Sequence, residues 1–175
     1  MRHQYRVTKF DPALRSEDGS FQGNEWTAHS DVGRSFDCVR LSEHEYLKVE
    51  AAYLFAVGAF LREAKIENLV LRSLKNYSDS ELPNFLQSEA NLSVAQSVEF
   101  ARFALRGHAW GKLTDPGRAY VHFGYDYYLY LGLPTRCPAA IAEIQGRGLF
   151  VEVFRSPYLR ARSSRLFQRS SNSKA

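Results

Sequence analysis

Apolar and polar positions recur with two different periods along this chain, and each change of period marks a new element. Segment 41–66 carries apolar residues at spacings of three and four, namely Tyr46, Val49, Tyr53, Ala56, Phe60 and Ala64, which predicts a helix. Ser42 and Glu45 supply a capping box at its start. Because apolar residues also cover its flanks over 51–61, we expect this helix to lie at the centre of the fold.

Two further helices are predicted from similar signals. Segment 93–107 begins with Ser93 and Gln96 at capping-box spacing and ends at Gly107. Segment 137–148 is shorter, and its Pro138 suits the first turn of a helix.

A period of two and β-forming residues predict strands in the remaining segments. These segments are 3–10, 68–77, 109–113, 118–124, 126–132 and 149–154. The turn formers at 114–117 suit a hairpin, and 11–25 should be a surface loop. We therefore expect an α+β fold with a mostly antiparallel sheet of about five strands and about three helices. A single domain over 1–158 and a basic, disordered tail over 159–175 complete this prediction.

Composition adds little to this fold prediction but does bear on function. Aromatic residues make up 14% of the chain, which favours strands or a contact surface. Two cysteines 99 residues apart, with no signal peptide before them, suggest free thiols in a cytoplasmic protein. The longest apolar run, 51–61, is too short to cross a bilayer, so no membrane is expected as a partner.

The charge is divided unevenly along the chain. Residues 155–175 hold six bases and no acid, whereas residues 1–154 hold 17 bases and 19 acids. The body therefore has a charge of −2 although the whole chain has a charge of +4. We expect nucleic acid to bind, if at all, only through the basic tail.

The sequence lacks the common motifs of catalysis and cofactor binding. It contains no P-loop, GxGxxG, GxSxG, HExxH or CxxC pattern, so no cofactor and no metal are predicted. The candidate catalytic residues are His122 and Asp126, which would form an acid–base pair if they met near a turn. Since Tyr-rich strands serve more often in packing or protein contact, we lean away from an enzyme.

The stretch "HFGYDYYLYLG" over 122–132 is the best candidate contact surface for a protein. Alternation predicts that Asp126, Tyr128 and Tyr130 form one solvent-exposed row, with Tyr127, Leu129 and Leu131 facing the core. A second candidate segment is 26–37. It contains Trp26 and Asp31, and Ser30 or Asp31 should cap a short helical turn there.

Five segments also resemble a family of small bacterial proteins associated with the immunity proteins of polymorphic toxin systems. They are "YRVTKFDP", "EWTAHSDVGRSF", "LSEHEYLKVEAAY", "VHFGYDYYLYLG" and "GLFVEVFRSPY", spread over residues 4–158. The resemblance implies a cytosolic, single-domain protein that binds and neutralises a cognate toxin. It assigns no catalytic or binding residue and does not extend into the tail.

Two other classes of function stay open at this level. One is an enzyme acting on a small substrate through His122 and Asp126. The other is an RNA-binding protein that acts through its arginine-rich tail, driven by counterion release. The oligomeric state is not predicted.

Overall fold

Seven strands pair in one antiparallel sheet in the computed structural model, which describes residues 1–17, 21–79 and 81–159. Their order across the sheet is β5-β4-β6-β7-β8-β1-β9. Their bounds, in that order, are Asn91–Ser93, Asn68–Asn76, Ala109–Asp115, Ala119–Phe123, Leu129–Leu133, His3–Thr8 and Phe150–Val153. A separate small hairpin consists of β2 (Ser35–Phe36) and β3 (Val39–Arg40).

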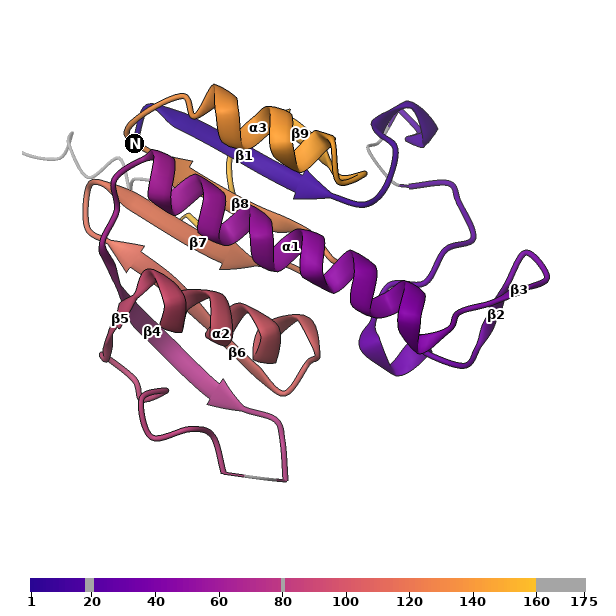
Figure 1. Ribbon diagram of the computed structural model, residues 1–175, viewed down its shortest axis with the longest axis horizontal. Helices are drawn as coiled ribbons and strands as arrows, with labels where there is room; N and C mark the ends of the chain where they lie inside the picture. The colour runs from indigo at the N-terminus through magenta and orange to yellow at the C-terminus, as the bar shows by residue number, and fades with distance from the viewer. Residues whose placement is uncertain (18–20, 80, 160–175) are drawn as a thin grey trace, which may run out of the picture.

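Helices α1 (Glu43–Glu63), α2 (Val94–Leu105) and α3 (Pro138–Gln145) all cover the same face of the sheet (Figure 1). The capping boxes predicted at the starts of α1 and α2 are both present. Two short 3-10 turns, Pro12–Leu14 and His29–Asp31, lie between β1 and β2. The α+β class, the three helices and the antiparallel sheet are thus confirmed.

The strand count is higher than predicted, for physical reasons that differ between the additions. Strand β5 has three residues and β2 and β3 two each, which is too short for alternation to show in a sequence. The strand predicted over 126–132 begins only at Leu129 because the preceding residues form a turn. That turn proves important for the candidate site.

The core lies between the sheet and the three helices. Helix α1 is central as predicted, and its side chains Tyr53, Val57 and Phe60 are fully buried. From the strands, Val7, Val121 and Leu131 meet them from the same side of the sheet. These residues and their neighbours form a single hydrophobic cluster.

The structure also bears on the predictions about a membrane, the two thiols and the tail. Within the described ranges, no helix is long and apolar enough to cross a membrane. Cys38 and Cys137 are both free thiols, as predicted. The tail predicted to be disordered falls, from residue 160 on, outside the described residues.

The opposite side of the sheet, which we call the helix-free face, carries aligned rows of side chains. Directly paired residues share a face, and the register places six of them in one row: Arg72, Lys112, His122, Tyr130, Arg6 and Glu152. In the next row Tyr120 lies across Gly132, where a Cβ would come within 2.1 Å of the Tyr120 ring. Glycine is therefore needed at position 132.

After β9 the chain turns back and crosses this face as an irregular segment, residues 154–159, which we call the strap. Phe154 packs on Tyr130, Ser156 bonds His122, and the Tyr158 ring approaches Trp110 on β6. The strap thus covers part of the face from β1 to β7 and ends beside β6.

Candidate functional site

The turn between β7 and β8 has an unusual backbone. The Tyr128 amide donates to the Tyr125 carbonyl at 3.2 Å, and the Gly124 amide donates to the Tyr128 carbonyl at 2.8 Å. The two central residues, Asp126 and Tyr127, have φ values of 55° and 60°. A bulky residue such as tyrosine is rarely found at positive φ, and such strain costs about 1–3 kcal/mol. The surrounding structure must therefore hold this turn in place.

Buried hydroxyl groups from α1 hold Tyr127. The Tyr53 hydroxyl donates to the Tyr127 carbonyl at 2.6 Å and accepts from the Lys9 amide at 2.8 Å. The Tyr127 hydroxyl donates to that of Tyr46 at 2.6 Å, which in turn donates to Glu50 at 3.3 Å. Burial raises the pKa of Tyr127 and that of Tyr46, the latter to about 12. Both hydroxyls therefore stay protonated and can donate at neutral pH.

An ion pair closes this chain of bonds. Arg106, the C-cap of α2, donates two bonds to Glu50 at 2.6 and 2.8 Å. Burial would raise the pKa of the Glu50 carboxyl, but the bonds and charge of Arg106 outweigh it and lower that pKa. The first half of α1 and the C-terminal end of α2 are thereby joined to the turn at 124–128.

The segment before β2 packs against the same tyrosines. The Trp26 ring lies 5.1 Å from that of Tyr127 and 5.6 Å from that of Tyr46, and the His29 ring lies 4.7 Å from Tyr46. Burial, and then the nearby charge of Arg106, lower the pKa of His29. His29 is therefore neutral at pH 7.

The buried Asp31 side chain stabilises this segment through hydrogen bonds and an ion pair. Its carboxylate accepts the amides of Thr27 and Ala28 at 2.9 and 3.1 Å and pairs with Arg34 at 2.8 Å. Burial would raise its pKa, yet these bonds hold it below the ordinary value. The prediction that Ser30 or Asp31 starts the short turn was wrong: Ala28 is the N-cap, and Asp31 reaches back from the end of the turn.

These elements surround a surface hollow of about 400 Å³ at the turn of the β7–β8 hairpin, and we call this hollow the hairpin end. It is lined by residues 27–30, 104–107 and 123–128. Tyr125 projects from its rim with 85% of its surface exposed. Asp126 is also exposed, and its carboxylate has no hydrogen bond or ion pair to any described residue. The Asp126 carboxylate and the Tyr125 ring are thus both exposed beside the hollow, on a turn that buried hydrogen bonds hold in place.

The predicted contact residues are distributed differently from the expectation. Trp26, Asp31, Asp126 and Tyr128 do gather around the hairpin end, although Trp26 and Tyr128 are half-buried and Asp31 is buried. The guanidinium groups of Arg6 and Arg15 lie 5.3 and 5.5 Å from the Tyr128 ring.

The predicted solvent-exposed row was wrong at Tyr130. Only 7% of Tyr130 is exposed because Phe154 and Tyr158 of the strap cover it. The opposite row, Tyr127, Leu129 and Leu131, faces the core as predicted.

His122 and Asp126 have quite different surroundings. His122 is 3% exposed, stacks on Tyr120 at 4.4 Å and bonds Ser156 through Nδ1 at 2.8 Å. Ser156 Oγ accepts the Tyr158 amide at 3.2 Å, so its hydroxyl proton is free to donate to a neutral imidazole. Burial, and then the charge of Lys112, lower the pKa of His122 to about 4. This geometry fastens the strap to the sheet.

Sequence reasoning missed Tyr125, Tyr127 and Ser156 as important residues. The pair Asp126 and Tyr127 was assigned to a strand, although Gly124 before it was a signal for a turn. No signal in the sequence pointed to Ser156, whose partner His122 lies 34 residues away.

Comparison with known proteins gives no relative: no family model matches the chain, and neither a curated protein nor a solved structure is significantly similar to it.

Proposed function

We propose that this protein is a binding protein without catalytic activity, an immunity protein that binds and neutralises a cognate bacterial toxin through the hairpin end. The observation that carries the proposal is the strained turn at Asp126 and Tyr127, which presents exposed groups on a rigid base. Backbone strain persists where the surroundings enforce it, and it concentrates at functional sites.

The exposed groups suit protein recognition. A tyrosine ring offers a large contact area at a small entropic cost, and such residues dominate binding energy at interfaces. Tyr125 supplies that ring, and the hollow beside it can receive a side chain of the partner. Because the turn is already fixed, little additional entropy is lost on binding.

The charges favour a basic group on the partner. Asp126 at the rim forms no ion pair within the described part of the chain, and Arg106 is neutralised by Glu50. The last turn of α2 borders the same hollow, and the C-terminal end of a helix has a partial negative charge. A lysine or arginine of the toxin would thus be attracted here.

The test is a titration against the toxin domain encoded by the neighbouring reading frame. Truncating an anchor residue at an interface costs about 2 kcal/mol or more, roughly thirtyfold in affinity, and we expect that loss for Tyr125→Ala. The matched control is Tyr77→Ala, since Tyr77 is also exposed but does not line the hollow. Equal affinities for both variants would refute the assignment, and failure of the intact protein to bind the domain or block its toxicity would refute the function.

A further inference from the structure

The helix-free face differs in charge from the body of the protein. By register, its strands present four bases, Arg6, Arg72, Lys75 and Lys112, and one acid, Glu152. The body to residue 154 has a charge of −2. Positive charge is therefore concentrated on the face that the helices leave open.

Among the residues that the structure describes, two of these bases have no acidic partner. Arg6 pairs with Glu152, and Arg72 pairs with Glu89. By contrast, Lys75 and Lys112 form no ion pair with any residue of the described ranges. They lie on adjacent strands, β4 and β6. Lys112 is beside the end of the strap, where its ammonium donates to the Tyr158 carbonyl at 3.5 Å.

Aromatic rings accompany these lysines. The Trp110 ring, half-exposed, is opposite Lys75 in the register, and its indole N–H donates to the Phe123 carbonyl at 3.2 Å. This bond fixes the ring across the sheet surface. The Lys112 ammonium lies 5.8 Å from the Trp110 ring and 5.7 Å from that of Tyr158, so cations and rings form one continuous patch.

We propose that this patch, formed by Lys75, Trp110, Lys112 and Tyr158, binds single-stranded nucleic acid. Unpaired cations suit the phosphates, and a ring held on a sheet can stack on a base. The described chain ends at Leu159, next to the patch, and the 16 residues that follow carry five bases and no acid. That segment cannot neutralise the patch and instead adds to the attraction for a polyanion.

This site is independent of the proposed toxin-binding surface. It also differs from the expectation that nucleic acid would bind only through the tail, because it assigns part of the recognition to the folded body. An acidic protein is the competing partner, and the proposal differs from it in requiring base stacking on Trp110.

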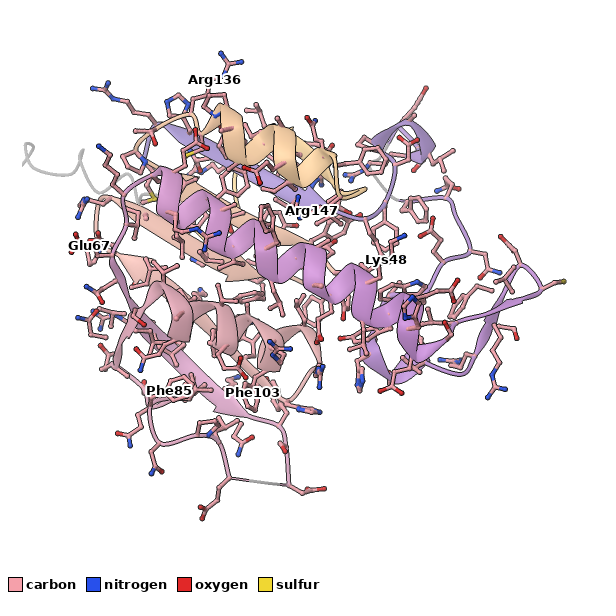
Figure 2. The ribbon with its side chains drawn as sticks, in the orientation of Figure 1. Lys48, Glu67, Phe85, Phe103, Arg136 and Arg147 are labelled. Carbon is pink, nitrogen blue, oxygen red and sulfur yellow. The ribbon has the colours of Figure 1, made fainter. Side chains whose placement is uncertain are left out.

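The test measures binding of a fluorescent uridine 20-mer to the full-length chain by anisotropy over a range of salt concentrations. The face variant is Lys75→Gln with Lys112→Gln. The control, Lys48→Gln with Arg136→Gln, removes the same charge from exposed positions on α1 and before α3, both labelled in Figure 2. Each phosphate contact contributes about 0.7 to the slope of log K against log salt concentration for a single strand. Losing two contacts should therefore weaken binding roughly 25-fold at about 0.1 M salt. The control should change affinity much less.

Three outcomes would overturn the proposal. The first is equal weakening in the two double variants, which would indicate unspecific attraction through the tail. The second is no binding of the 20-mer by the intact chain at low salt. The third is competition by polyglutamate as strong as that by unlabelled uridine 20-mer, which would indicate an acidic protein partner.

Discussion

At the scale of single residues, burial decides what each polar side chain can do. His122 and Asp126 are four positions apart, yet one is sealed under the strap and the other is open to solvent at the hairpin end. Asp31 looks like a surface cap in the sequence but is a buried acceptor for two amides and a guanidinium. Such roles depend on what folds over a residue, which its near neighbours in sequence do not reveal.

The buried histidine predicts a specific pH dependence of stability. Because the pKa of His122 falls from 6.5 to about 4 on folding, the unfolded chain binds more protons between these values. The free energy of unfolding therefore decreases as the pH falls from about 6.5 to about 4, with the full contribution present above 6.5. At about 1.4 kcal/mol per pKa unit, His122 alone accounts for about 3 kcal/mol.

Urea unfolding of the wild type and of His122→Gln at pH 7, 5.5 and 4 isolates this contribution. We expect the stability difference between the two proteins to shrink by about 3 kcal/mol over that range. Parallel stability curves would show that His122 does not stay neutral in the fold.

At the scale of elements, the helices and long strands follow from local patterns, whereas the connections between them do not. Helix α1 and its capping box could be predicted because Ser42 and Glu45 lie within one turn of each other. The position of the strap and the turn at Asp126 depend on contacts made far along the chain, such as the bond from Tyr53 to Tyr127. Pattern analysis predicted the framework of the candidate site but not its geometry.

The Tyr53 hydroxyl links α1 to the turn at 124–128 and to the residue after β1. Tyr53→Phe removes the bonds from α1 to the Tyr127 carbonyl and to the Lys9 amide after β1. Leaving such groups unpaired in the interior costs about 1–3 kcal/mol, so we expect that loss of stability in chemical denaturation. Tyr77→Phe removes an exposed hydroxyl and should change stability by less than about 0.5 kcal/mol. An equally small effect of Tyr53→Phe would mean that the turn is held by packing alone.

At the scale of the whole molecule, the two faces of the sheet differ in the side chains that they carry. The helix-covered face holds the core, and the network of Tyr127, Tyr46, Glu50 and Arg106 extends from that core to the hairpin end. The helix-free face carries the excess of bases. This division could not be predicted, because the bases come from strands separated in sequence and only the register brings them together.

The most direct test of the proposed toxin-binding surface is amide hydrogen exchange of the protein with and without the candidate toxin domain. Complex formation should slow exchange in residues 27–30 and 124–128, which border the hollow, because a bound partner excludes water from the amides of its contact surface. Exchange on the exposed side of the β2–β3 hairpin should stay unchanged. Protection confined to that hairpin or to the helix-free face, with 124–128 exchanging as in the free protein, would contradict the account.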